Sequence, residues 1–142
     1  MTERPDLFAA VNAGVGAMDM ISFERTANGP GNVPEFGSTK TEAGFKALLA
    51  MSAYHHVKDG TRYPALLLTH GVNDPRVEVW NSTKYGARVM AAQAGVADTA
   101  PVLMRLDWQA GHGMGNTKAQ QLDQTADTWA FFFERMGGAR PR

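Results

Sequence analysis

Two short segments of this sequence carry side chains that could perform acid–base chemistry. Residues 71–77 (GVNDPRV) contain Asp74, and residues 110–116 (AGHGMGN) contain His112. A carboxylate that hydrogen-bonds to an imidazole fixes the tautomer of the ring and stabilises its protonated form. The second ring nitrogen is then free to take a proton from a nucleophile. Asp74 and His112 are therefore a candidate catalytic pair.

Each segment follows an apolar run with the pattern of a buried parallel strand. Residues 64–69 (PALLLT) precede Asp74, and residues 101–108 (PVLMRLDW) precede His112. Continuous apolar runs bounded by turn residues are typical of strands that are covered on both faces. Reactive groups in open α/β sheets gather beyond the C-terminal ends of the strands. Because neighbouring strands lie roughly 5 Å apart, the two side chains can meet although they are distant in the sequence.

The remaining segments predict an α/β fold. Residues 8–15 (FAAVNAGV) predict a first strand, while the three glycines and two prolines in residues 26–38 predict a loop without regular structure. Strands and helices that alternate along the chain predict a layer of about three parallel strands with flanking helices, joined by right-handed crossovers.

Three helices are expected from capping signals and apolar spacing. The first follows Thr39 and Glu42, which are spaced as a capping box, and the second spans residues 80–93. The third begins near Thr117, where Gln120 completes a second capping box, and stops at Gly137. We expect its apolar residues to face a core: Leu122, Ala126, Trp129, Phe132, Phe133 and Met136.

The composition favours one domain over residues 1–142 and argues against several classes of function. Fourteen basic residues balance fourteen acidic ones, and no basic run occurs, so nucleic acid is not an expected partner. The absence of cysteine excludes disulfides, thiolate metal sites and cysteine nucleophiles. The N-terminus is polar and no apolar run is long enough to span a bilayer, which predicts a soluble, cytoplasmic protein without a membrane partner.

Neither a metal site nor a cofactor site is expected. His55, His56 and His70 are accompanied by no HExxH motif and no cluster of carboxylates, so we interpret them as solvated or core histidines. The glycines around His112 lack the strand-to-helix context of a dinucleotide-binding motif. We interpret them as residues that let the loop turn sharply.

Several long segments resemble the catalytic domain of the prolyl oligopeptidase family. The segment YPALLLTHGVNDPRVEVWNSTKYGARV is similar to the region around the catalytic aspartate of that family, and DWQAGHGMGNTKAQ to the region around its catalytic histidine. RPDLFAAVNAGVGAMDM and EFGSTKTEAGFKALLAMSAYHHVKDGTRYPA resemble the segments before them, so the resemblance spans essentially the whole chain. It implies the C-terminal portion of an α/β-hydrolase domain, in a truncated form that lacks the nucleophile elbow.

The resemblance also implies roles for individual residues. Asp74 corresponds to the residue that orients the histidine, His112 to the general base and acid, and Arg76 to an arginine that pairs with a carbonyl or carboxylate of the substrate. Asn32 stands where better-known members place a tryptophan that stacks on the proline of the substrate. The implied substrate is a small ester or a peptide.

The family's nucleophile lies in a Gly-x-Ser-x-Gly elbow that precedes the segment corresponding to RPDLF. None of the four serines of this chain has a glycine two positions before it, so none has the elbow pattern. A water activated by the histidine or an improvised serine, Ser22 or Ser82, remains as the nucleophile. Such a site would act on carboxylic esters rather than on peptides.

Several interpretations stay open at this point. Asp74 is also the residue that a turn before Pro75 would use, and His112 is also an ordinary loop residue. The sequence therefore leaves three functions open: a small esterase, a catalytically silent folded fragment, or an assembly or binding module. Since the family's sheet continues beyond the first strand, we expect that strand to have an unpaired edge and the chain to form homo-oligomers through it.

Overall fold

A computed structural model describes residues 1–113 and 117–137 of the chain. Three short 3₁₀ turns accompany the strands and helices: η1 (Pro5–Leu7), η2 (Gly29–Asn32) and η3 (Ala53–His56). The strands and α-helices, in chain order, are β1 (Ala10–Gly14), α1 (Met20–Phe23), α2 (Val33–Phe36), α3 (Glu42–Met51), β2 (Ala65–Gly71), α4 (Trp80–Ala92), β3 (Val102–Asp107) and α5 (Lys118–Met136).

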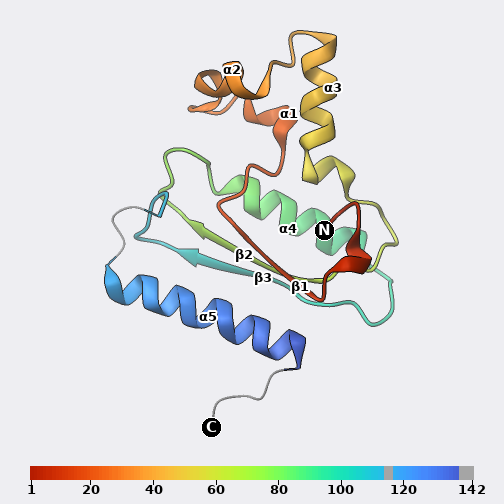
Figure 1. Cartoon of the computed structure of the whole chain (residues 1–142), viewed down its shortest axis with the longest axis vertical. Helices are drawn as coiled ribbons and strands as arrows, with labels where there is room; N and C mark the ends of the chain where they lie inside the picture. The colour runs from red at the N-terminus through yellow and green to blue at the C-terminus, as the bar shows by residue number, and fades with distance from the viewer. Residues whose placement is uncertain (114–116, 138–142) are drawn as a thin grey trace.

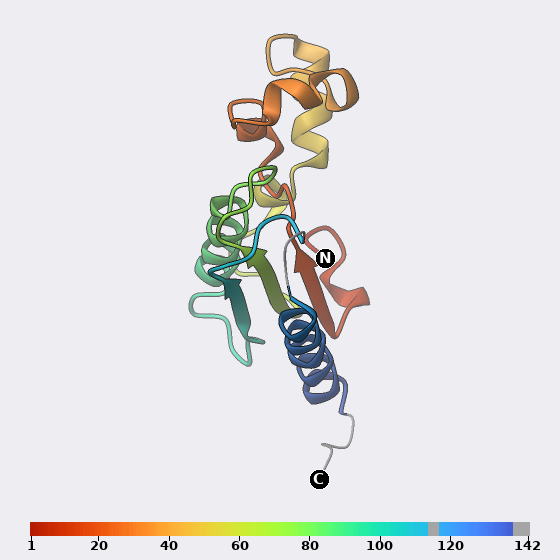
Figure 2. The same cartoon turned by 90° about the vertical axis from the view of Figure 1, so that its left-hand side faces the viewer.

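The three strands form one parallel sheet in the order β1-β2-β3. Helix α4 packs against β2 and β3, and α5 packs against β1 and β2. The two helices lie on opposite faces of the sheet (Figures 1 and 2). The predicted α/β fold is thus confirmed, and each strand begins and ends within about two residues of the predicted range.

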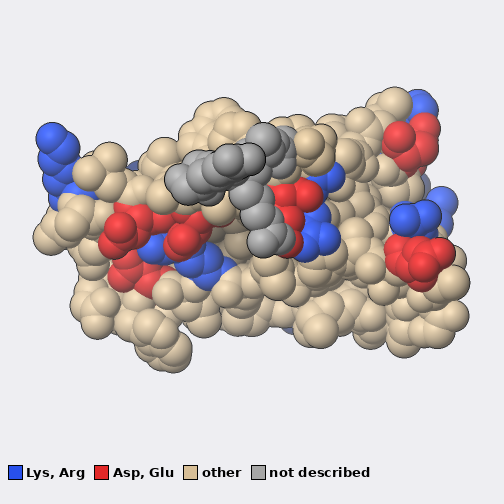
Figure 3. All heavy atoms as spheres, turned by 90° about the horizontal axis from the view of Figure 1, so that it is seen from below, with Lys and Arg blue, Asp and Glu red and all other residues tan. Residues whose placement is uncertain are grey.

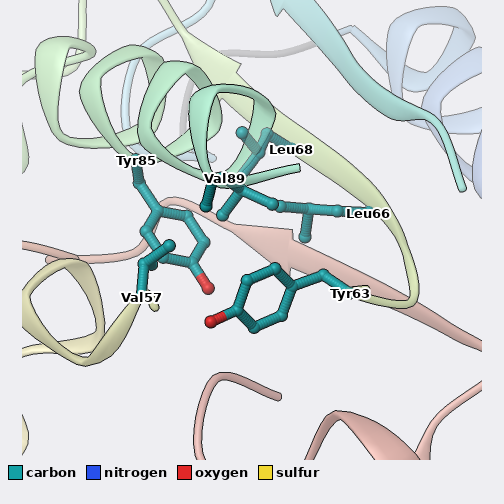
Figure 4. Packing of buried hydrophobic residues seen from close by; sticks show 7 residues of the cluster. Val57, Tyr63, Leu66, Leu68, Tyr85 and Val89 are labelled. Atoms are coloured by element: carbon teal, nitrogen blue, oxygen red, sulfur yellow. The ribbon is translucent and has the colours of Figure 1, made fainter. Parts of the chain in front are cut away.

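The central strand β2 is buried along its whole length because helices cover both of its faces. Leu66 and Leu68 point towards α4 and pack with Tyr63, Tyr85 and Val89 (Figure 4). The alternate residues Ala65 and Leu67 pack on the other face with Phe131 of α5. Side chains of a strand alternate between its faces, so the unbroken apolar run in the sequence supplies both layers of the core.

Helices α1, α2 and α3 form an arm, residues 20–51, that extends from the sheet and α4 (Figure 1). Its small core contains Met20, Phe23 and Leu48, and Phe36 and Val77 pack against it. Val77 belongs to the loop that follows β2, so the arm rests on the loop that carries Asp74.

The prediction that residues 26–38 lack regular structure was wrong. Residues 29–36 form η2 and α2, and a proline occupies the first turn of each, Pro30 and Pro34. Proline lacks an N–H that the first turn does not use, and its fixed φ suits a helix start. Proline at these positions therefore permits short helical turns.

The capping residue of α3 was also predicted wrongly. Thr41, and not Thr39, accepts the N–H of Gly44 and caps the helix. Thr39 instead donates its N–H and its hydroxyl to the carboxylate of Glu24, each at 2.8 Å. Together with the Ser38 hydroxyl, these hydrogen bonds lower the pKa of Glu24 to about 2. The pattern Ser-Thr-Lys-Thr offers several hydroxyls, and the sequence alone does not select between them.

Helix α5 begins and ends where predicted, with the capping box of Thr117 and Gln120 and with Gly137 at a φ of 76°. The expected orientation of its apolar residues was correct for Phe132 but wrong for the others. Phe131 is the only buried residue among those described in this helix, and Phe132 packs beside it. A stripe that was expected to face the core is instead mostly exposed: Leu122 (60%), Trp129 (55%), Phe133 (44%) and Met136 (59%). Ala126 is exposed as well.

Candidate active site

Asp74 lies in a tight turn immediately beyond the C-terminal end of β2. Its side chain is completely buried. One carboxylate oxygen, Oδ1, accepts the backbone N–H groups of Arg76 at 2.8 Å and Val77 at 3.0 Å. An aspartate that accepts N–H groups two and three residues later is a common turn-forming arrangement. The turn therefore fixes the direction of the second oxygen, Oδ2.

That second oxygen faces the loop after β3. Nδ1 of His112 lies 2.8 Å from Asp74 Oδ2, which is hydrogen-bond distance. The imidazole side chain is 30% exposed, so the ring remains accessible from solvent. The structure thus brings together the two residues whose pairing the spacing of the strands predicted.

Backbone contacts between the two loops hold this pair in place. The N–H of Asn73 donates to the carbonyl of Ala110 at 3.1 Å, and its side-chain amide donates to the carbonyl of Trp108 at 2.8 Å. A Cβ atom at Gly71 would lie 2.3 Å from the carbonyl oxygen of Gly111. Only glycine allows this approach, so Gly71 brings the His112 loop close to the Asp74 turn.

The electrostatic environment keeps Asp74 ionised. Burial opposes the charge, but the N–H groups of Val77 and Arg76 and the ring of His112 outweigh it, so the pKa of Asp74 lies below its ordinary value. An ionised carboxylate at Oδ2 requires a proton on Nδ1 of His112. In the neutral ring, Nε2 is then unprotonated, which is the form that a general base needs.

A second histidine lies close to Asp74. His70, on β2, is completely buried, and its Nε2 lies 2.7 Å from the carbonyl oxygen of Val77 and 3.7 Å from Asp74 Oδ2. Its Nδ1 lies 2.7 Å from the hydroxyl of Ser82. The sequence predicts only that His70 is a solvated or core histidine, and the structure makes it a core residue. The one available signal was a polar residue at the end of an apolar strand, next to the loop of the site.

The two serines proposed as improvised nucleophiles have other partners. The hydroxyl of Ser82 is buried on α4 and bonds to His70. The hydroxyl of Ser22 donates to Asp19 at 2.8 Å, and Lys84 binds the same carboxylate oxygen. Neither hydroxyl is hydrogen-bonded to the candidate base.

The two predicted substrate-binding residues lie in different surroundings. Arg76 is exposed directly beside the Asp74 turn. Asn32 lies on η2 of the arm, where its amide donates to the carbonyl of Asn28 at 3.0 Å. The arm meets the Asp74 loop through the N–H of Ala27, which donates to Glu78 at 3.1 Å.

A small hollow at the C-terminal ends of the strands is lined in part by Gly111 and Gly113, the two neighbours of His112. Val15, Arg105, Gly113 and Gln124 are among the residues that line it. Val15 has a φ of 51°, which is a strained conformation for a β-branched residue. Strained residues persist only where the surrounding structure enforces them, and they cluster at functional sites.

The remaining histidines, His55 and His56, bond to groups close to them in the chain. His55 bonds to Ser52, and His56 bonds to the carbonyls of Leu49 and Ala50. Among the described residues no group of three potential metal ligands occurs. None of the described helices combines the length and the apolar character needed to cross a bilayer.

Comparisons with known proteins show the family to which the chain belongs. The profile of the Prolyl oligopeptidase family matches residues 1–139. The prolyl endopeptidase of Elizabethkingia miricola is 36% identical over 138 residues, and that of Dictyostelium discoideum is 35% identical over 131 residues. These matches cover 96% and 92% of this chain but only 19% and 17% of the relatives, so the chain spans about a fifth of their length.

Solved structures give the same result. A structure from a study of two prolyl endopeptidases superposes with a TM-score of 0.84 at 32% identity, covering 98% of this chain and 20% of the other. Oligopeptidase B from Trypanosoma brucei, with covalently bound antipain, gives a TM-score of 0.87 at 25% identity, covering 98% and 19%. The chain therefore belongs to the prolyl oligopeptidase family of serine peptidases, and its three strands and flanking helices are a part of that family's α/β-hydrolase domain.

Proposed function

We propose that Asp74 and His112 form the acid–base pair of a hydrolytic site, and that the described chain hydrolyses short carboxylic esters rather than peptides. The observation that carries this proposal is the 2.8 Å contact between a buried carboxylate and a partly exposed imidazole. Such a pair keeps one imidazole nitrogen unprotonated and turned away from the carboxylate. The family membership supports the same roles.

The proposed nucleophile is water, because the hydroxyls of Ser22 and Ser82 are engaged with other side chains. Nε2 of His112 takes one proton from the water while its oxygen forms a bond to the ester carbonyl carbon. The resulting tetrahedral intermediate collapses by breaking the bond to the leaving alkoxide or phenolate. His112 returns the proton to the leaving group, and Asp74 remains ionised throughout.

Esters are the favoured substrates because their hydrolysis requires less acid catalysis from this site than the hydrolysis of peptides does. An amide nitrogen must be protonated before it leaves, whereas a phenolate leaves without protonation. The tryptophan that the resemblance associates with proline binding is replaced by Asn32. Arg76 is exposed beside the pair and is the proposed contact for a carbonyl or carboxylate of the substrate.

The test is hydrolysis of p-nitrophenyl acetate by the purified chain, compared with His112→Ala and Asp74→Asn. His56→Ala is the matched control, because that histidine bonds only to the end of α3 and serves to detect surface imidazole catalysis. We expect both site variants to lose the rate and the control to keep it. Equal rates in all four proteins would assign the hydrolysis to a contaminant or to nonspecific imidazoles. A complete absence of hydrolysis would favour the catalytically silent fragment.

A specific observation favours an assembly module as the second candidate. β1 is at the edge of the described sheet, and the exposed apolar stripe of α5 lies on the helix that packs against β1 and β2. Seen from below, the charged side chains form separate mixed groups with uncharged surface between them (Figure 3). An exposed edge strand with an apolar neighbour is a template for association.

We propose that this surface joins two copies of the chain. Light scattering behind a sizing column should report a dimer that Trp129→Glu converts to a monomer. Met90→Glu is the control, because Met90 is 59% exposed, close to the 55% of Trp129, but lies on α4, on the opposite face of the sheet. A monodisperse monomer for the unsubstituted chain would exclude this candidate.

A further inference from the structure

His70 is completely buried and polar, and it is not part of the acid–base pair. Its side chain has no exposed surface, and both ring nitrogens lie 2.7 Å from a partner atom. A buried imidazole without partners would be costly, and this ring has two. The two partners belong to different elements, the loop after β2 and the first turn of α4.

The partners determine the tautomer of this ring. The carbonyl oxygen of Val77 can only accept, so Nε2 of His70 carries the proton and donates it at 2.7 Å. In a neutral ring Nδ1 is then the acceptor, and the hydroxyl of Ser82, 2.7 Å away, is its donor. The ring thus connects the end of β2, the Val77 peptide and the start of α4 in one fixed arrangement.

Val77 links this arrangement to the candidate site. Its carbonyl accepts from His70, while its own N–H donates to Oδ1 of Asp74 at 3.0 Å. The donating nitrogen of His70 also lies 3.7 Å from Oδ2, the oxygen that faces His112. A shift of the Val77 segment would therefore move the carboxylate as well.

We propose that His70 is a positioning residue for the Asp74–His112 pair, because it anchors the Val77 carbonyl to α4 and so holds Asp74 Oδ2 against His112 Nδ1. Its consequence for hydrolysis rests on the proposed function, whereas its consequence for the geometry of the pair does not. A histidine that only fills space in the core would stabilise the fold without fixing the tautomer of His112.

The two roles are separated by variants that keep or remove the donor to Val77. His70→Gln carries an amide N–H at nearly the position of Nε2 and should preserve the contact, whereas His70→Asn reaches only the position of Nδ1. Ser82→Ala removes the hydroxyl but leaves Nε2 in place. Ser52→Ala is the matched control, since Ser52 is an equally buried serine whose partners are Met18, Met20 and His55.

The first measurement is the nitrogen-15 chemical shift of both ring nitrogens of His112, which reports its tautomer whether or not the chain is active. We expect the Nδ1–H tautomer to dominate in the unsubstituted chain, Ser52→Ala and His70→Gln, and to lose its dominance in His70→Asn. Thermal unfolding measured in parallel identifies any variant that fails to fold. If His70→Asn does not fold, the other two variants decide the question. A His112 tautomer that is normal in Ser82→Ala but disturbed in His70→Gln would overturn the proposal.

The second measurement is p-nitrophenyl acetate hydrolysis. Misplacing a catalytic group by about 1 Å costs up to roughly a hundredfold, so His70→Asn should lose at least about tenfold and His70→Gln should regain most of it. A folded His70→Asn with the tautomer and rate of the unsubstituted chain would refute the positioning role. If His112→Ala hydrolyses the ester as fast as the unsubstituted chain, the proposed function fails while the tautomer measurement still decides the role of His70.

Discussion

Substitution of Asp74 separates what its carboxylate does for the turn from what it does for His112. Asp74→Ala removes the acceptor of two backbone N–H groups and of the imidazole. Each partly buried donor left without a partner costs about 1 kcal/mol, and the bond to the imidazole contributes a similar amount. We therefore expect Asp74→Ala to lower the free energy of unfolding by about 3 kcal/mol.

Asp74→Asn should cost only about 1 kcal/mol, because the amide oxygen still accepts the N–H groups of Arg76 and Val77. Its amide NH₂, however, replaces the oxygen that faces His112. Nδ1 of the ring must then accept, so the proton moves to Nε2. The neutral base is lost although the turn survives, and ester hydrolysis should fall to the level of His112→Ala.

Urea unfolding followed by tryptophan fluorescence measures the difference. With a slope of about 2 kcal/mol per molar urea, the midpoint should fall by about 1.5 M for Asp74→Ala and by about 0.5 M for Asp74→Asn. Equal shifts for the two variants would contradict this reasoning, because they would show that the two N–H groups are satisfied without Asp74. A hydrolysis rate for Asp74→Asn equal to that of the unsubstituted chain would contradict the tautomer argument.

Two further substitutions test the surroundings of the site. Glu24→Gln should remove an acid-sensitive step in the unfolding of the arm. Because the pKa of Glu24 is lowered to about 2 in the folded chain, its contribution to stability is complete above its ordinary pKa and is lost as the pH falls towards 2. Circular dichroism between pH 5 and 2 should show a smaller change in the variant. An identical titration would disprove that the hydrogen bonds of Glu24 to Ser38 and Thr39 stabilise the arm. Gly71→Ala should destabilise the chain by about 2 kcal/mol and abolish hydrolysis, because its Cβ would displace the Gly111 carbonyl. Unchanged melting and activity would show that the two loops separate without cost.

The part of the site that could be predicted from the sequence is the part that follows directly from the adjacency of parallel strands. Two apolar runs predicted neighbouring parallel strands, and this adjacency was enough to bring Asp74 and His112 together. His70 could not be assigned a role, because its partners depend on how the loop folds back over the first turn of α4. That path is determined by packing against the arm rather than by local sequence.

Helix α5 illustrates a different limit. Its apolar spacing correctly predicted a helix but not the direction that each apolar residue faces. Phe131 packs on the sheet, while Trp129 and Met136 are exposed. The helix carries apolar residues over more of its circumference than three strands can cover, so periodicity alone does not select the buried side.

The register of the strands has a consequence for the order in which the molecule assembles. Ala10 pairs with Ala65 across 55 positions, whereas Leu66 pairs with Val102 across 36. The entropy of closing a loop grows with its length, and such non-local pairing slows folding. Pairing of β2 with β3, the strands that precede the loops of Asp74 and His112, closes the shorter loop, so we expect these two strands to pair before β1 joins them.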